Sequence, residues 1–353
     1  MTRPRFAPMH LNLQTCLNRQ MWRLAGIAAL TATVFFASPA NAQSQSPPGS
    51  SLNELLDSVV LLKTYVNPDA QSASSLGHER TGSGIIIDDS GLILTIGYLM
   101  AEAYSAEIVT NSGRKVAVNT VGYDPDTGFG LMRAAEPLKI KPMPFGKSSD
   151  VKVRDQVLAA SFGGVGGVAP AFIASKRPFA GNWEYLLDET FFTMPAHNLW
   201  SGAALINREG KLVGVGSLVV GDASGKGDGV PGNMYVPTDL LTPILADLIS
   251  DGRSSRPARP WLGVTTNDTE GLLTIGRVTP GSPAAKAGLQ RGDVITGVAG
   301  QPTKTLPDFY RKVWAQGTAG VTVPLDVTRN GAVQHISVQS VDRLQNLKLK
   351  STL

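Results

Sequence analysis

Short apolar runs separated by turn residues fill most of the chain after residue 52. Many of these runs are rich in β-branched residues and are bounded by Gly, Pro, Asn or Asp, a pattern that predicts strands. They form two consecutive clusters of similar size, which predict two small β-barrels packed together. The predicted strands are 59–65, the hairpin 81–95, 106–110, 115–121, 130–133, 156–161, 168–175, 183–187, 191–194, 203–206, 212–220 and 233–236.

Two short helices are predicted around the strand clusters. Leu52–Leu56 precedes the first cluster, and Asp239–Ser250 follows the second with its large apolar residues on one helical face and Thr238 as the N-cap. A basic, Ser- and Pro-rich segment without apolar periodicity comes next and predicts a domain linker. The predicted order is a barrel domain at 52–252, the linker at 253–260, a smaller module of strands and helices at 261–343 and a frayed tail at 344–353.

The first 42 residues have the features of a secretory signal peptide. Four arginines precede the apolar run Leu24–Ala37, which leads to the small-x-small signal Ala40-Asn41-Ala42. We therefore predict cleavage after Ala42 and export, with a bacterial periplasm as the destination. An uncleaved membrane anchor is the alternative, although the run is shorter than the ~20 apolar residues that a span needs. The polar residues 43–51 read as a flexible linker.

Removal of this leader changes the charge and cysteine counts. The leader carries four of the 32 basic residues and none of the 28 acidic ones, so the mature chain has 28 of each and a formal charge of zero. The pI of 9.1 therefore gives no reason to expect a nucleic-acid partner. The single cysteine, Cys16, also lies in the leader, which excludes thiol catalysis in the mature chain. The sequence shows no metal-ligand cluster, phosphate loop or cofactor fingerprint, and we predict no cofactor; glycine-rich 163–167 reads as a loop.

The chemistry-bearing stretch of the chain is Asn198–Ile206, followed by a second glycine-rich strand at 210–216. A Ser-Gly-small-small turn that leads into an apolar strand is how trypsin-like proteases present a nucleophilic serine. Ser201 occupies that place here. Serine nucleophiles need a base within hydrogen-bond reach and a carboxylate that orients the base.

The mature chain resembles the HtrA/Deg family of periplasmic serine proteases along nearly its whole length. The module after the linker carries the most specific mark, because Val278–Ile295 resembles the helix, turn and strand of an HtrA-type PDZ domain almost position for position. The resemblance implies a mostly β protein, with a trypsin-like double barrel followed by one small α+β PDZ domain. The marks in the barrel domain are Gly82–Asp88, Gly91–Thr95, Gly122–Pro125, Val157–Ala160 and Gly210–Gly214.

Two of the three catalytic positions that the resemblance implies hold other residues here. Tyr98 occupies the position of the family's histidine, and Gly128 occupies that of its aspartate. A tyrosine of ordinary pKa near 10 is a poor base at neutral pH. His197, four residues before Ser201, is the candidate for a substitute base, and a loop or capping histidine is the alternative reading. Asp126 could be a displaced orienting carboxylate, but it would have no base to orient.

The oxyanion hole that the resemblance implies is also altered. The family's Gly-Asn-Ser-Gly-Gly is replaced here by Leu199-Trp200-Ser201-Gly202-Ala203. A β-carbon at Leu199 and an indole at Trp200 are expected to refold the hole or plug the cleft.

The peptide-binding loop that a PDZ domain implies corresponds to Trp261-Leu262-Gly263-Val264. Backbone N–H groups of such a loop capture a C-terminal carboxylate while the peptide adds as a strand to a sheet edge. Gly263 is expected to let the backbone approach the ligand, and Leu262 and Val264 to line the side-chain pocket.

These residues together predict a proteolytically inactive pseudoprotease that binds peptides or protein C-termini in envelope protein quality control. The alternative is an active serine endopeptidase that uses Ser201 with a non-standard base. A third class, a structural role, follows from analogy: members of the family form trimers, so a homotrimer or an assembly with an active relative is the expectation of this class. No membrane span is predicted in the mature chain.

Overall fold

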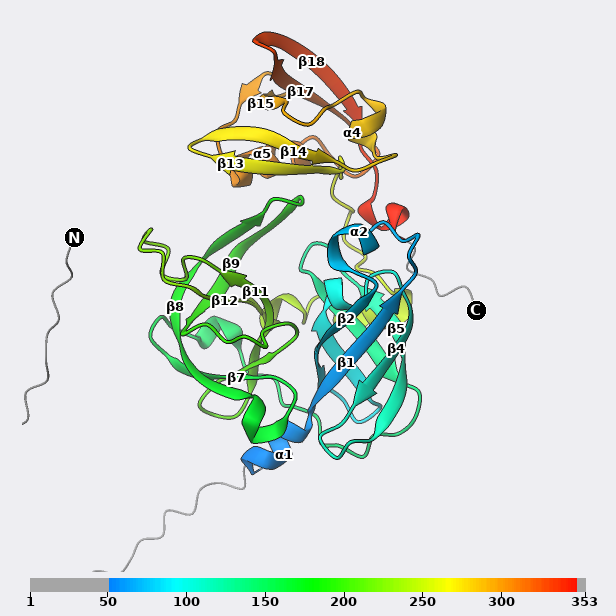
Figure 1. The fold of residues 1–353 in the computed structure, drawn as a ribbon, viewed down its shortest axis with the longest axis vertical. Helices are drawn as coiled ribbons and strands as arrows, with labels where there is room; N and C mark the ends of the chain where they lie inside the picture. The colour runs from blue at the N-terminus through cyan, green and yellow to red at the C-terminus, as the bar shows by residue number, and fades with distance from the viewer. Residues whose placement is uncertain (1–50, 348–353) are drawn as a thin grey trace, which may run out of the picture. The chain divides into compact units, whose positions relative to one another are not determined.

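Two closed β-barrels and a smaller third sheet make up the protein (Figure 1). The structure is a computed structural model that describes residues 51–347. The predicted signal peptide and its cleavage site lie outside these residues. Contacts join these described residues into one unit. Among residues 51–347 there is no helix with both the length and the apolar character to cross a membrane.

The first barrel follows the predicted strands closely. A short helix precedes it, with the Ser51 hydroxyl accepting a hydrogen bond from the Glu54 N–H at 3.2 Å as the N-cap. The strands close in the order β1-β2-β3-β6-β5-β4, with every neighbouring pair antiparallel. Its elements are α1 Leu52–Asp57, β1 Val59–Val66, α2 Ala73–Leu76, β2 Glu79–Ile86, β3 Leu92–Ile96, η1 Gly97–Leu99, β4 Ala103–Val109, β5 Lys115–Tyr123 and β6 Phe129–Ala134.

The second barrel closes in the order β10-β11-β12-β9-β8-β7. Two predicted strands, 183–187 and 191–194, are a single strand, β9. The polar pair between them, Asp188-Glu189, is exposed and lies at a register shift of the ladder with β8, which continues on both sides of it. The elements are η2 Ser148–Asp150, β7 Gln156–Ala160, η3 Gly164–Gly167, β8 Val168–Gly181, β9 Tyr185–Met194, β10 Ala204–Ile206, β11 Leu212–Val220 and β12 Gly232–Pro237.

The predicted helix at 239–250 is shorter than expected. A 3₁₀ turn, η4 (Thr238–Leu240), is followed by an α-helix, α3, only at Leu245–Asp251. Pro243 explains the interruption, because proline lacks an N–H and disfavours the helical conformation of the residue before it. Thr238 is therefore no N-cap; its hydroxyl donates to the Leu212 carbonyl at 3.4 Å instead.

The third sheet, in the order β13-β14-β15-β17-β18, forms the module after the linker. Helix α4 begins as predicted: the Ser282 hydroxyl caps it by accepting from the Ala285 N–H, and Pro283 stands in its first turn. A 3₁₀ turn, η5 (Arg343–Asn346), forms where we expected the frayed tail to begin. The other elements are β13 Val264–Thr269, β14 Leu272–Val278, α4 Pro283–Lys286, β15 Val294–Val298, β16 Gln301–Pro302, α5 Leu306–Trp314, β17 Thr322–Arg329 and β18 Ala332–Gln339.

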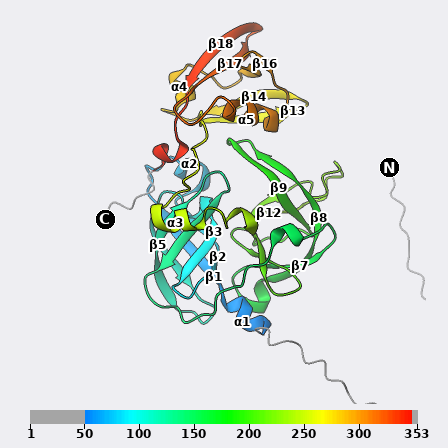
Figure 2. The same ribbon diagram turned by 180° about the vertical axis from the view of Figure 1, so that it is seen from behind.

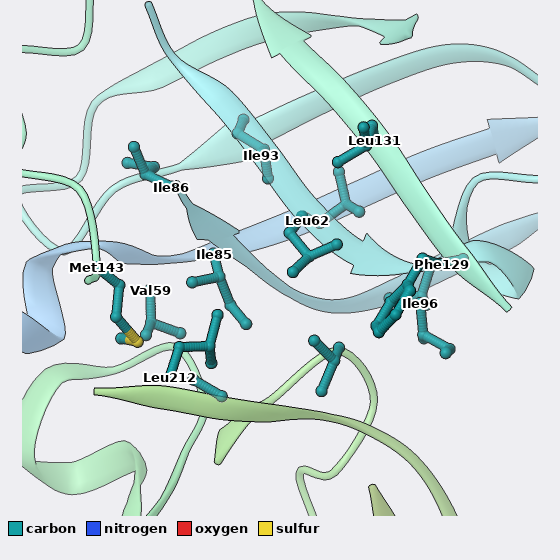
Figure 3. Close-up of a cluster of buried hydrophobic side chains, with 14 of the residues drawn as sticks. Val59, Leu62, Ile85, Ile86, Ile93, Ile96, Phe129, Leu131, Met143 and Leu212 are labelled. Atoms are coloured by element: carbon teal, nitrogen blue, oxygen red, sulfur yellow. The ribbon is translucent and has the colours of Figure 1, made fainter. Parts of the chain in front are cut away.

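The main hydrophobic core runs from the interior of the first barrel to the second. In Figure 3 the side chains of Ile85 and Val59 point toward Leu212, which belongs to β11 of the second barrel, while Leu62 and Leu131 fill the first barrel's interior. All of these side chains are fully buried. The two barrels therefore share apolar contacts as well as each having its own interior. Figure 2 shows the strands of the two barrels from behind.

Truncation of Leu62, which is 0% exposed, should test this core. We expect Leu62→Ala to lower the free energy of unfolding by about 2–5 kcal/mol, because the lost methyl groups leave a cavity. Leu272→Ala is the matched control, since Leu272 is 52% exposed and should cost less than ~0.5 kcal/mol. Urea unfolding followed by circular dichroism measures both; equal losses would mean that the barrel interior is not packed as described.

Candidate functional site

The turn that carries Ser201 is held by backbone hydrogen bonds to both barrels. The Ser201 carbonyl accepts from the Ser83 N–H of β2 at 2.8 Å, and the Gly202 N–H donates to the Gly216 carbonyl of β11 at 2.9 Å. Gly202 has a φ of +72°, and a β-carbon there would lie 2.0 Å from the Ser83 carbonyl oxygen. Only glycine fits this position, for reasons of backbone conformation and of space together.

Tyr98 faces Ser201 from the first barrel. It lies on the 3₁₀ turn η1. The Tyr98 carbonyl, and the Ala101 carbonyl just after the turn, accept from the Arg80 guanidinium at 2.7 and 2.8 Å. The Tyr98 hydroxyl is 2.8 Å from Ser201 Oγ and 2.7 Å from the Ser217 carbonyl oxygen. The residue at the histidine position therefore does contact the serine hydroxyl.

The direction of these hydrogen bonds follows from counting protons. A carbonyl oxygen can only accept, so the single Tyr98 proton goes to Ser217. The Ser201 hydroxyl must then donate to Tyr98 Oη. Burial raises the pKa of Tyr98 to about 12, while hydrogen bonds from Ser201 and Trp200 oppose the shift. At pH 7 about one molecule in 10⁵ would carry a phenolate, so the group beside Ser201 is a neutral phenol.

Gly128 leaves no side chain beside this turn, and another residue fills the space. The Gly97 N–H donates to the Gly128 carbonyl at 2.7 Å, which places Gly128 next to the turn that bears Tyr98. Gly128 has a φ of +80°, and a β-carbon there would lie 3.2 Å from the Tyr185 hydroxyl. Tyr185, on β9, is buried and donates to the Thr127 carbonyl at 2.7 Å. No pattern in the sequence pointed to this role of Tyr185.

The two residues considered as substitutes have other partners. His197 Nε2 is 3.3 Å from Ser161 Oγ, and its backbone N–H and carbonyl bind the Asn233 side chain. Burial lowers the pKa of His197, which favours the neutral ring. Asp126 pairs with Arg259 at 3.2 Å, and burial raises the pKa of this carboxyl to about 6 against the effect of that arginine.

Leu199 and Trp200 line a cleft of about 630 Å³ that contains Ser201 and Tyr98. The Leu199 side chain is 58% exposed in this region. The cleft walls are mainly apolar, and Phe162 from the loop after β7 also lines the cleft.

The loop Trp261–Val264 presents its N–H groups to a carboxylate from the same chain. The N–H groups of Leu262, Gly263 and Val264 donate to the Glu184 carboxylate at 2.8, 2.7 and 2.9 Å. Trp261 pairs with Val341 through two backbone hydrogen bonds. Sequence reasoning selected the loop but missed Glu184, which is an ordinary glutamate in a polar hairpin turn and carries no motif.

Two of the loop's features differ from what the sequence suggested. Leu262 and Val264 are both buried in the core of the C-terminal module. Val264 lines a cavity of about 860 Å³ together with Trp261 and Gly263, whereas Leu262 does not. Gly263 has a φ of +85°, and a β-carbon there would lie 2.3 Å from Ser282 Cβ. Glycine is therefore required by the packing of the loop on α4 as well as by its conformation.

Comparison with known proteins identifies both domains. Residues 82–215 match the family described as Trypsin-like peptidase domain, and residues 260–339 match the PDZ domain family. The Periplasmic pH-dependent serine endoprotease DegQ of Escherichia coli (strain K12) is 27% identical, over 78% of this chain and 62% of its own length. Serine protease PepD of Mycobacterium tuberculosis is 30% identical, over 82% of this chain and 65% of its own length. The chain thus spans just under two thirds of these relatives.

A solved structure, that of the HtrA-type protease AlgW with decapeptide, has the same fold. It aligns with a TM-score of 0.50 and 22% identity, over 83% of this chain and 99% of that chain. The expected order of a trypsin-like double barrel and one PDZ domain, in a mostly β protein, is confirmed.

Substitution of Gly202 tests how tightly the Ser201 turn is packed. Gly113 has a similar φ of +83° but no atom within 4 Å of where a β-carbon would lie, so Gly113→Ala isolates the conformational cost of about 1–2 kcal/mol. Gly202→Ala should lose about 1–3 kcal/mol more, because the turn must also move away from Ser83. Thermal and urea unfolding of the two variants measure the difference, and equal losses would contradict the close contact with β2.

Proposed function

We propose that this chain, a relative of the HtrA-type serine endoproteases that combines a trypsin-like peptidase domain with a PDZ domain, is an exported binding protein without proteolytic activity. The observation that carries the proposal is the hydrogen bond from the Ser201 hydroxyl to the neutral Tyr98 phenol. A neutral phenol is too weak a base to take the proton of an attacking serine at neutral pH.

The size of the deficit supports inactivity. In a comparable serine protease, removal of the triad's function costs about 10⁶-fold in kcat, and removal of one oxyanion donor costs about 100- to 1000-fold. Here Tyr98 stands at the base position, Tyr185 fills the space beside Gly128, and Leu199 replaces a glycine. Hydrolysis near the uncatalysed rate is therefore the expected outcome.

The binding half of the proposal rests on the PDZ domain. Three N–H groups of its loop converge on one carboxylate, which is the geometry needed to hold a peptide's C-terminus. The ligands we propose are peptides or protein C-termini. The names of two relatives, which are periplasmic serine endoproteases, support export to the same compartment. A part in envelope protein quality control is a further element of the proposal. Cleavage after Ala42, and assembly as a homotrimer or with an active relative, belong to this proposal.

The test of inactivity is labelling of the purified mature chain with a fluorophosphonate probe, alongside degradation of casein. We expect the wild-type chain to label no faster than Ser201→Ala and to leave casein intact. If slow labelling occurs, its rate should not change between about pH 6 and 9 through ionisation of Tyr98, because Tyr98, with a pKa of about 12, stays neutral in that range.

Labelling that is lost in both Ser201→Ala and His197→Ala would overturn the proposal. It would favour the alternative, an active endopeptidase with a non-standard base. Labelling that is lost in Ser201→Ala but kept in His197→Ala would also overturn inactivity and would direct attention to Tyr98→Phe.

Peptide binding is tested with a library of C-terminal peptides that end in hydrophobic residues. We expect binding in the micromolar range for peptides with a free carboxylate and a loss of at least about tenfold for the same peptides with an amidated C-terminus, because the amide removes the charged acceptor. Fluorescence anisotropy measures both forms. Equal affinity for the two forms would contradict recognition by the Leu262–Val264 amides.

A further inference from the structure

We propose that the tip of the β8–β9 hairpin, residues 181–184, is an internal ligand of the PDZ groove, by which we mean the Leu262–Val264 loop with β13 and α5. The Glu184 side chain takes the place of a peptide's terminal carboxylate. This inference rests on the proposed peptide-binding function of that groove, and it names the group that regulates access to it. A free peptide then binds only when the hairpin leaves.

The carboxylate contacts are complete. Glu184 Oε1 accepts from the Gly263 and Val264 N–H groups, and Oε2 accepts from the Leu262 N–H, all within 2.9 Å. Glu184 is 7% exposed. The three consecutive N–H groups of Leu262, Gly263 and Val264 thus all donate to one buried acidic side chain. None of the three remains to bind a second carboxylate.

The hairpin backbone also continues the peptide-like pattern. The Asn182 carbonyl accepts from the Thr266 N–H of β13 at 2.8 Å, two residues from the loop, as an added strand would. From the other side, the Tyr310 hydroxyl of α5 donates to the Gly181 carbonyl at 2.8 Å, and the Glu184 N–H donates to that hydroxyl at 3.2 Å. The tip therefore lies between β13 and α5.

Apolar contacts extend the same interface. Leu186 of β9 is buried in the hydrophobic cluster of the C-terminal module, together with Leu262 and Val264, and Ala180 of β8 packs against that cluster. An ion pair between Asp188 and Arg311, with N and O 2.6 Å apart, lies at the exposed edge. The hairpin thus supplies a backbone hydrogen bond to β13, a carboxylate and an apolar anchor, which are three kinds of contact that a PDZ ligand makes.

The backbone of Glu184 is suited to this presentation. Its φ of +58° is in the left-handed region, which turns the chain sharply between Asn182 and Tyr185. A linear peptide presents the carboxylate at its C-terminus. A hairpin has no terminus, so it can present a carboxylate to the loop only from an acidic side chain, here at a tight turn. Burial raises the pKa of Glu184, whereas the three N–H groups and the charge of Arg343 oppose the shift.

Glu184→Ala in the full mature chain tests the proposal, with Glu184→Gln as a variant of equal size. Glu189→Ala is the matched control, because Glu189 lies in β9 of the same hairpin and pairs with Lys176 instead of the Leu262–Val264 amides. We expect both Glu184 variants to bind a free-carboxylate peptide at least about tenfold more tightly than wild type, since a larger share of grooves is open. Glu189→Ala should match wild type.

Hydrogen exchange supplies a readout that needs no peptide. In wild type the amides of Leu262, Gly263 and Val264 should exchange slowly, and in Glu184→Ala they should exchange faster while the amides of the β1–β6 barrel stay unchanged. Unchanged exchange at these three amides would overturn the proposal even if no peptide binds.

The outcomes separate this inference from the function on which it rests. Equal peptide affinity in wild type and both Glu184 variants would overturn the internal ligand and leave peptide binding intact. Absence of peptide binding in all variants, with faster exchange in Glu184→Ala, would overturn the proposed peptide function and support an occupied groove. Tighter binding in Glu189→Ala as well would contradict a specific role for Glu184.

Discussion

The close backbone contact between β2 and the Ser201 turn is the constraint on which the double barrel depends. Gly82 has no room for a β-carbon, which would lie 2.8 Å from the Ser201 carbonyl oxygen, and Gly202 has none on the facing side. The Ser83–Ser201 hydrogen bond closes this contact. Glycine at 202 is therefore required to join the two barrels at this point, whereas residue 201 takes part through its backbone carbonyl. The turn's geometry alone is no sign of catalysis.

The chemistry of the cleft depends on what meets this turn from the first barrel. Tyr98 reaches the serine hydroxyl as an imidazole would, but the lone pair that it offers belongs to a neutral phenol, which is a much weaker base than an imidazole. The same phenol joins Ser201 to the Ser217 carbonyl, in a cleft with mainly apolar walls.

The sequence predicted the fold more completely than the site. Strands such as β1 and β11 have strong patterns and lie close to their expected bounds, whereas the helix expected at 239–250 was shortened by Pro243, whose local effect outweighs periodicity. Tyr98 could be placed opposite Ser201 from the resemblance alone. Tyr185 and Glu184 could not, because their roles arise where the β8–β9 hairpin meets residues distant in sequence, and no local pattern encodes such a meeting.

The buried Glu184 carboxylate has a consequence for competition inside the molecule. A ligand that is part of the same chain is present at an effective concentration in the millimolar range when short connections hold it near its site. A free peptide at micromolar concentration must therefore have an intrinsic affinity for the groove about a thousandfold higher than that of the hairpin, if it is to occupy half of the grooves. Abundant chain ends that bind weakly would not displace the hairpin. Only a ligand that binds tightly, or that is held at high local concentration, would occupy the groove.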